Sequence, residues 1–504
     1  MSRPLSRRLI GNLAGSWTAM AIRLPVTFLL TPFLIRSLGE ERFGAFGVLI
    51  SLLAYMNLAG GPLHSSIGRE LAHAGSDPKA RGRVLATAVA AAGLLALLTA
   101  LVGFPLLGPL TRAMRVPVEF QADALACFAT LIGTVILAQT LTPAIGLLMS
   151  RNRYDLVDLV EASGQVLYAV LAVLVFRLVD PSLARLGLAN LAAQIVAGIA
   201  TVTLARRGGV ETPLRLGAVD RTELRSLLGF SSQLFLINVS VLLTYQTDNI
   251  VIARLVGVAA VAHYAVAGSL ILRFRQLCYG LSRTFMPATA DPDTTPERLR
   301  ALHLRGTRYM TLLVAGLGGV AFGLAEPFYA LWLGESFRGS GFLFRILMAA
   351  NLFGMSQFVT NAVLTGLRRT RALMVSEVLG ALANLGLSIA FVRGGLGLPG
   401  VALGTLIPMV IRNVWLAVHG ARVVGAPFAP YVTRVYGPAG VAFVLVAGAL
   451  ELLARGGMLT SWGGLIAGGA FGLALFLVLA WAMVLDREDR GRIRELVPAM
   501  RGRA

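Results

Sequence analysis

Apolar runs long enough to cross a lipid bilayer recur from one end of this chain to the other. Two examples are the stretches 84–107 and 466–485. A helix needs ~20 apolar residues to cross ~30 Å of hydrocarbon, whereas a transmembrane strand would show ~10 residues of alternating polarity. Because 56% of the 504 residues are hydrophobic and only 14% are charged, we predict an all-α polytopic membrane protein.

The runs predict about 14 transmembrane helices. Their expected ranges are 12–35, 43–64, 84–106, 122–149, 158–176, 186–204, 229–247, 258–286, 309–332, 342–366, 372–392, 400–419, 436–454 and 463–485. The longest segments between them are 205–228 and 287–308, which are too short for a soluble domain of any size.

The basic residues divide unevenly between the two predicted faces of the membrane. With a cytoplasmic N-terminus, cytoplasmic segments collect 29 of the 45 Lys and Arg, the opposite side collects 10, and six lie inside spans. Cytoplasmic loops carry the excess of basic residues, so we expect both termini in the cytoplasm. This explains the net charge of +20 without a nucleic-acid partner.

The chain repeats itself at a shift of 218 residues. Segment 33–52 then aligns with 251–270, and Gln139 with Gln357, while a shift of 216 aligns Glu161 with Glu377. Six spans separate the copies, so both have the same orientation, which predicts two parallel six-helix lobes. The predicted domains are an N-terminal lobe at 1–228, a C-terminal lobe at 229–435, and two additional C-terminal helices with a basic cytoplasmic tail at 436–504.

Three segments resemble a known transporter family. They are FLIRSLGEERFGAFGVLISL (33–52), QTDNIVIARLVGVAAVAHYAVAGSL (246–270) and NAVLTGLRRTRALMVSEVLGALANLGLSIAFVRGGLGLPGVALGTLI (361–407). They resemble the Wzx-like polysaccharide-biosynthesis flippases of the multidrug/oligosaccharidyl-lipid/polysaccharide (MOP) exporter superfamily. One departure is that Leu30 stands in the first copy where the second has Asp248.

The resemblance implies a function, a place and partners. Such a flippase moves an oligosaccharide on an undecaprenyl-type polyprenyl pyrophosphate from the cytoplasmic to the periplasmic leaflet of the bacterial inner membrane. It works by alternating access, for O-antigen or another surface polysaccharide. The resemblance also implies a V-shaped cavity between the lobes and, as in lipid II flippases, an arginine-lined cavity with a lipid-tail groove framed by spans 13 and 14. Membrane lipids and a neighbouring polymerase or glycosyltransferase are the other expected partners.

Three arginines inside spans are candidates for binding the pyrophosphate. In GSLILRFRQLCY (268–279), Arg273 lies near mid-bilayer, unless the span ends at Leu272 and Arg273 and Arg275 form a cytoplasmic flank. Arg273 and Arg275 are ~200° apart on a helix and face different directions. Arg23 is either a second cationic wall of the cavity or the partner of a carboxylate in another span. A guanidinium fork suits phosphate oxygens.

Uncharged polar residues inside spans extend the candidate site. Asn57, the repeat mate of Arg275, is a candidate for substrate binding, and Gln139 and Gln357 either bind sugar hydroxyls or bridge helices. Asp248 and Asn249 form either a gate or coupling site or a helix cap with an arginine partner.

Glu161 and Glu377, near helix N-termini, are expected to be structural. The ridge of Gly464, Gly468 and Gly472 indicates helix packing or a smooth face for a lipid tail.

The sequence also bears on other functions. The chain shows no nucleotide-binding loop, nucleophile elbow or His/Cys cluster, so we expect no metal or cofactor beyond a coupling ion, Na⁺ or H⁺.

A lipid II flippase and a cation-coupled multidrug exporter of the same superfamily are alternatives. Six arginines inside spans favour an anionic substrate over a lipophilic cation. A membrane glycan polymerase or ligase would carry a large outer loop, and the predicted outer loops are short.

Overall fold

The computed structural model describes residues 3–58, 60–75, 77–207, 219–282, 294–367 and 369–484. Regular structure in these ranges consists of α-, 3-10 and π-helices, which confirms the all-α prediction. The chain divides into two compact units, Met1–Ala262 and His263–Ala504, and the boundary falls inside helix α10 (Val258–Ser282). The predicted lobe boundary between residues 228 and 229 stays a prediction, and part of the predicted basic tail lies outside the described residues.

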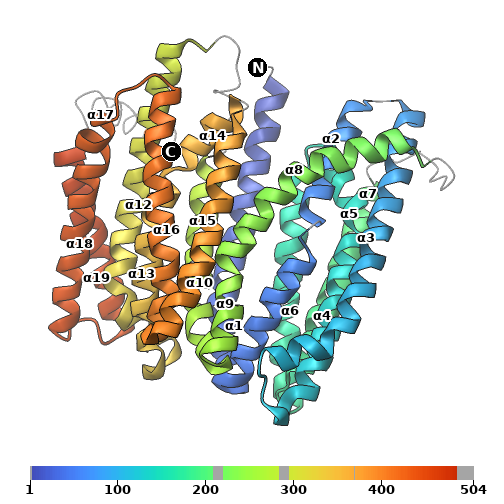
Figure 1. The fold of residues 1–504 in the computed structure, drawn as a ribbon, viewed down its shortest axis with the longest axis horizontal. Helices are drawn as coiled ribbons and strands as arrows, with labels where there is room; N and C mark the ends of the chain where they lie inside the picture. The colour runs from blue at the N-terminus through green and yellow to red at the C-terminus, as the bar shows by residue number, and fades with distance from the viewer. Residues whose placement is uncertain are drawn as a thin grey trace. The chain divides into compact units, whose positions relative to one another are not determined.

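The first unit is built from long helices that lie side by side (Figure 1). Its elements before α10 are α1 (Arg3–Met56), α2 (Gly60–His73), α3 (Pro78–Ala113), η1 (Val118–Phe120), α4 (Gln121–Thr140), α5 (Thr142–Ser150), α6 (Tyr154–Leu178), α7 (Leu183–Arg207), α8 (Arg221–Tyr245) and α9 (Thr247–Leu255). Buried Leu63, Ile67, Leu85 and Leu148 pack α2, α3 and α5 around one apolar core.

The second unit carries the last two long helices. Its elements after α10 are α12 (Pro296–Leu333), η3 (Glu335–Phe337), α13 (Arg338–Ser356), α14 (Phe358–Gly366), α15 (Thr370–Phe391), η4 (Val392–Leu396), α16 (Gly397–Val423), α17 (Ala429–Tyr431), η5 (Val432–Tyr436), α18 (Gly437–Arg455), α19 (Trp462–Leu479) and η6 (Ala480–Val484). Buried Ala442, Val446, Leu450 and Phe476 pack α18 and α19 together.

Eleven described helical stretches are long and apolar enough to cross a membrane. Two of them, Trp17–His73 and Thr370–Val423, each contain two predicted spans, so the eleven stretches cover thirteen of the fourteen predictions. The seventh predicted span, 229–247, lies largely on α8, which is not among the eleven stretches found in the described residues. The count of about fourteen is therefore approximate, and the polytopic architecture is confirmed.

The predicted repeat coincides with the positions at which helices break. Gly39 interrupts α1 with φ 78°, and its repeat mate Gly257 separates α9 from α10 with φ 140°. Both backbones lie in the region that favours glycine because it has no Cβ. Further along, α4 ends at Thr140, just after Gln139, and α13 ends at Ser356, just before Gln357. Aligned positions of the two halves thus have similar backbone roles.

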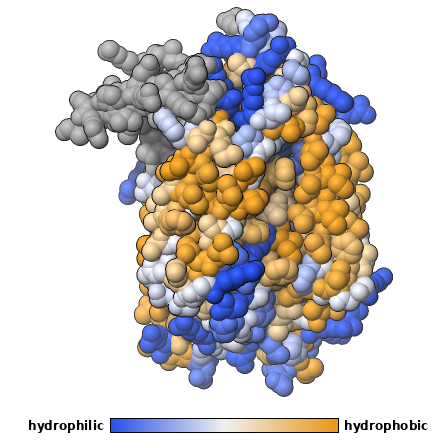
Figure 2. Space-filling model, turned by 90° about the vertical axis from the view of Figure 1, so that its left-hand side faces the viewer, coloured by the Kyte–Doolittle hydropathy of each residue, from blue (hydrophilic) through white to orange (hydrophobic). Residues whose placement is uncertain are grey.

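The glycine ridge of α19 is a packing surface. A methyl group on Gly468 would lie 2.7 Å from Leu459 Cδ2, and one on Gly472 would lie 2.8 Å from Leu450 Cδ1. Small residues let helices approach closely in this way. Away from the ridge, Ile466 and Val478 are 72% and 65% exposed. Figure 2, which views the molecule from the left-hand side of Figure 1, shows broad apolar areas on that side. Exposed apolar side chains of this kind are typical of a lipid-facing helix surface.

Candidate functional site

Arg273 and Arg275 lie within a continuous helix. Helix α10 extends from Val258 to Ser282, and the stretch Val258–Gly280 is long and apolar enough to span a membrane. The helix therefore continues past Leu272, so a cytoplasmic flank that begins at Arg273 would itself be helical. Arg273 is fifteen residues from the start of α10, or ~22 Å at 1.5 Å per residue. Both charges lie inside a candidate span.

The two arginines have different surroundings. Arg275 donates from Nη1 to Asn351 Oδ1 at 3.1 Å, and its guanidinium lies 5.2 Å from the ring centroid of Phe358. Tyr279, one helical turn further on, packs edge-on against the same ring. Arg273 instead donates to Gln276 Oε1 of its own helix at 3.3 Å. Arg275 is thus held against α13 and α14, as expected from its different direction on the helix.

A buried asparagine extends the polar surroundings of Arg275. Asn413 of α16 is fully buried, and neither its amide oxygen nor its amide nitrogen has a hydrogen-bond partner among the described residues. A methyl group on Gly354 would lie 3.2 Å from Asn413 Nδ2 and 3.9 Å from Arg275 Nη1. Sequence reasoning missed Asn351 and Asn413, although a polar residue inside an apolar run is itself a signal of function.

Arg23 forms an ion pair inside the first unit. Its Nη2 lies 2.8 Å from Glu161 Oε2 of α6 and 3.0 Å from the carbonyl oxygen of Asp158. The second unit repeats the glutamate: Arg412 Nη1 lies 2.7 Å from Glu377 Oε2. The arginine is thus placed as the partner of a carboxylate, one of the two roles considered from the sequence, and its contact with substrate stays a prediction.

Gln139 and Gln357 both bridge helices. Gln139, fully buried, donates from Nε2 to Thr99 Oγ1 of α3 at 2.9 Å. Gln357 donates to the Tyr436 hydroxyl at 2.8 Å and accepts from Thr360 at 2.9 Å. These bonds favour the structural role, and contact with sugar stays a prediction.

The hydrogen bonds of Gln357 continue into a buried chain. Thr360 Oγ1 lies 3.0 Å from His303 Nε2, and His303 Nδ1 lies 2.6 Å from the Tyr431 hydroxyl. His303, Thr360 and Tyr431 are each 1% exposed. These hydrogen bonds join α12, α14 and α17. Sequence reasoning did not identify them because their members lie far apart in the sequence.

The predicted gate residues lie at the junction of α8 and α9. Asn249 Nδ2 donates to Ser51 Oγ at 2.9 Å, and Ser51 donates to Gln246 Oε1 at 2.9 Å. Asp248 is 3% exposed beside them. This polar junction ties α1 to the α8–α9 break. Asn57 is exposed just after the end of α1, and its role in binding stays a prediction.

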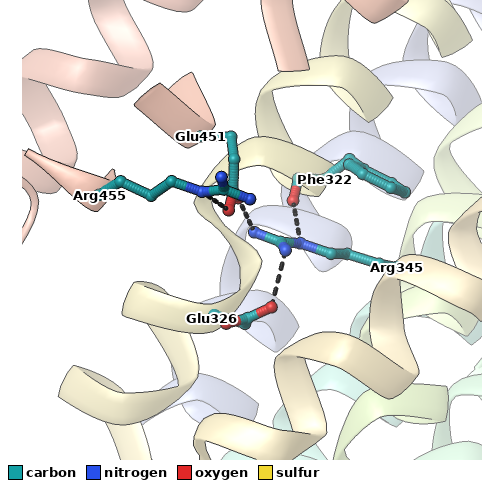
Figure 3. A network of polar contacts seen from close by, with 5 residues as sticks. All are labelled: Phe322, Glu326, Arg345, Glu451 and Arg455. Carbon is teal, nitrogen blue, oxygen red and sulfur yellow. Dashed lines mark hydrogen bonds and ion pairs between the residues drawn. The ribbon is translucent and has the colours of Figure 1, made fainter. Parts of the chain in front are cut away.

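A charged network joins α12, α13 and α18 in the second unit (Figure 3). Arg345 donates to Glu326 Oε1 at 2.7 Å, to Glu451 Oε2 at 2.6 Å and to the Phe322 carbonyl oxygen at 3.0 Å. Arg455 adds a bond to Glu451 Oε1 at 3.1 Å. The side chain of Arg345 is only 14% exposed. It therefore binds the first of the two additional C-terminal helices to α12 and α13.

Comparisons with known proteins agree with this architecture. Residues 120–341 match a family described as "Polysaccharide biosynthesis protein". The "Uncharacterized membrane protein EpsK" of Bacillus subtilis (strain 168) is 24% identical over 493 residues, covering 95% of this chain and 96% of that protein.

Two solved structures share the fold. The lipid II flippase MurJ in an inward closed conformation superposes with a TM-score of 0.72 at 12% identity, covering 92% of this chain and 97% of that one. An inward-facing multidrug resistance MATE transporter superposes with a TM-score of 0.70 at 16% identity, covering 80% and 98%. The chain is therefore similar to a polysaccharide-biosynthesis family over residues 120–341 and shares the multi-pass helical fold of these two membrane transporters, in agreement with the resemblance of the three sequence segments.

Proposed function

We propose that the protein is a flippase for an oligosaccharide linked to an undecaprenyl-type pyrophosphate, which it moves from the cytoplasmic to the periplasmic leaflet of the bacterial inner membrane by alternating access. The observation that carries the proposal is the position of Arg273 and Arg275 inside α10. A charge at the centre of a span costs ~2.5–3.5 kcal/mol on insertion scales, and an ionisable residue within a span marks a functional site by default. Guanidinium forks match pyrophosphate oxygens.

The two arginines have separate roles in this proposal. Arg275 is fixed by Asn351 and Phe358 and supplies a positioned charge. Arg273, bonded to the exposed Gln276, is the residue that reaches the pyrophosphate. The matched polysaccharide-biosynthesis family and the fold shared with a lipid II flippase support a lipid-linked glycan as the substrate class. A coupling ion, Na⁺ or H⁺, would act near Asp248.

One observation weighs against a cation-coupled drug exporter. Four glutamates of the described helices, at positions 161, 326, 377 and 451, each form an ion pair with an arginine. A lipophilic cation would have to displace a guanidinium to reach any of them, which favours an anionic substrate. A lipid II flippase remains the alternative within the same substrate chemistry.

The test is surface glycan in a deletion strain complemented with variants at matched protein level. Arg273→Ala should abolish export and Arg273→Lys should restore part of it, because a lysine keeps the charge without the fork. Losing one charge-assisted contact weakens binding by about 1.5–3 kcal/mol, or one to two decades in Kd. Arg422→Ala, an exposed arginine in the last turn of α16, is the control.

Two outcomes decide between the alternatives. Normal glycan export from the Arg23→Ala/Arg273→Ala double variant would contradict the proposal. Growth of a strain depleted of its own lipid II flippase, when this protein is supplied, would assign the peptidoglycan precursor as the substrate instead. Flipping of a labelled polyprenyl-pyrophosphate glycan in proteoliposomes would establish transport directly.

A further inference from the structure

A charged pocket lies at one end of the second unit, where α12 turns into α13 and α18 turns into α19. Its volume is about 470 Å³. The charged residues that line it are Glu326, Glu335, Arg338, Arg345, Glu451 and Arg455. Three arginines and three glutamates make it electrically balanced, so it suits a ligand that carries both charges.

The pocket has a fixed floor and an exchangeable rim. At its floor Arg345 is held by both Glu326 and Glu451, as Figure 3 shows. On the rim, Arg338 and Arg455 are 50% and 76% exposed, and their bonds to Glu335 and Glu451 are solvent-facing. Exposed ion pairs of this kind contribute ~0–1 kcal/mol, so a ligand can replace them at little cost.

The pocket opens beside lipid-facing surface. Leu452, Met458 and Ile466, on or between α18 and α19, are 71%, 65% and 72% exposed. Figure 2 shows hydrophilic residues interrupting the apolar surface on this side of the molecule. Trp462 begins α19 at the same end. Tryptophan is enriched at the membrane–water interface, which places the pocket at the level of lipid headgroups.

We infer that this pocket binds a phosphatidylethanolamine molecule of the surrounding bilayer. Its phosphate accepts hydrogen bonds from Arg338 and Arg455, and its ammonium donates to the rim carboxylate of Glu335. The acyl chains lie along the exposed apolar side chains of α18 and α19. Phosphatidylcholine has no N–H to donate, and phosphatidylglycerol has no cation, so neither satisfies both halves of the pocket.

Native mass spectrometry of the purified full chain, with equal amounts of the three lipids, tests the inference. Phosphatidylethanolamine should be retained over the other two, and Arg338→Gln/Arg455→Gln should weaken its binding about ten- to hundred-fold. Arg422→Gln is the matched control. It changes an exposed arginine in a last helical turn at the opposite end of the unit, where Arg300 near the start of α12 bonds Val424.

A second measurement covers the outcome that a variant folds poorly. The thermal midpoint of the wild-type protein should rise in nanodiscs with phosphatidylethanolamine relative to phosphatidylglycerol, and the double variant should lose that difference. Equal retention of all three lipids, or unchanged retention by the double variant, would overturn the inference. Free O-phosphoethanolamine binding as tightly as the lipid would also overturn it, because the site would then recognise a soluble ester. None of these outcomes depends on which glycan is transported.

Discussion

Replacing Arg345 by Met removes the central cation of the network that binds α18 to α12 and α13. Glu326 and Glu451, 31% and 29% exposed, would then lose this partner, and Glu451 would keep Arg455. Breaking a buried pair costs about 3–5 kcal/mol and breaking an exposed pair about 0.2–1 kcal/mol. Because the carboxylates are partly exposed, we expect Arg345→Met to lower the free energy of unfolding by about 2–3 kcal/mol.

Reversible unfolding in SDS/detergent mixed micelles measures this loss. The matched control is Arg338→Gln, because the Arg338–Glu335 pair is 50% and 73% exposed and should contribute less than about 1 kcal/mol. Neutralising Arg345 together with its two carboxylates, as Arg345→Met/Glu326→Gln/Glu451→Gln, should recover at least half of the loss, since the one charge that loses its carboxylate, Arg455, is 76% exposed. If Arg345→Met and Arg338→Gln cost the same, the network does not hold α18 in place and the reasoning is refuted.

Three further predictions address other parts of the chain. Backbone N–H groups of Thr222 and Glu223 donate to the Asp220 carboxylate and lower its pKa. The stabilisation of α8 by this N-cap is therefore fully present above the unfolded pKa of ~3.9 and is lost as the pH falls through the folded pKa. Amide-exchange protection at the start of α8 should therefore drop on acidification in the wild type and not in Asp220→Asn. Gly404→Ala would place a methyl group 2.6 Å from the Ser388 backbone nitrogen and should cost about 1–3 kcal/mol in detergent unfolding, whereas Gly386→Ala, with open space, should gain about 0.5–1 kcal/mol. Reporter fusions should read periplasmic at Pro117 and Gly339. They should read cytoplasmic at three positions outside the described residues, Ser76, Gly217 and Pro292. A periplasmic signal at Gly217 would overturn the span count.

The fold class could be predicted because hydrophobicity and length alone decide it. The ends of the helices could not be predicted from the same signal, since helices continue beyond the hydrocarbon. Helix α12 begins at Pro296, where Thr295 caps it by accepting from Arg298, although the apolar run begins only near residue 309. A threonine followed by proline is a helix-start signature, and it could have predicted this beginning from the sequence. Hydropathy thus indicates which part of a helix lies in the membrane, and capping residues indicate where the helix begins.

The candidate site was predictable in part. A charged residue inside an apolar run is visible in the sequence, so Arg23, Arg273 and Arg275 could be identified. Their partners could not, because Arg275 and Asn351 are brought together by the packing of α10 against α13, which no local pattern encodes. The same holds for Glu451, which reaches Arg345 across 106 positions of the chain.

The two lobes place similar glutamates and pair them differently. Glu161 and Glu377 align in the repeat, yet Glu161 takes its arginine from α1 and Glu377 takes its arginine from α16. At the shift of 218 residues, the repeat mate of Arg23 is Val241. At the shift of 216 residues, which aligns the two glutamates, the repeat mate of Arg412 is Val196. If both halves contacted substrate through this arginine, it would stand on the corresponding helix in each half. A glutamate that needs only charge compensation can instead pair with an arginine from any helix within reach. The asymmetry therefore favours a structural role for Arg23 and concentrates the proposed pyrophosphate contact on Arg273 and Arg275 of α10.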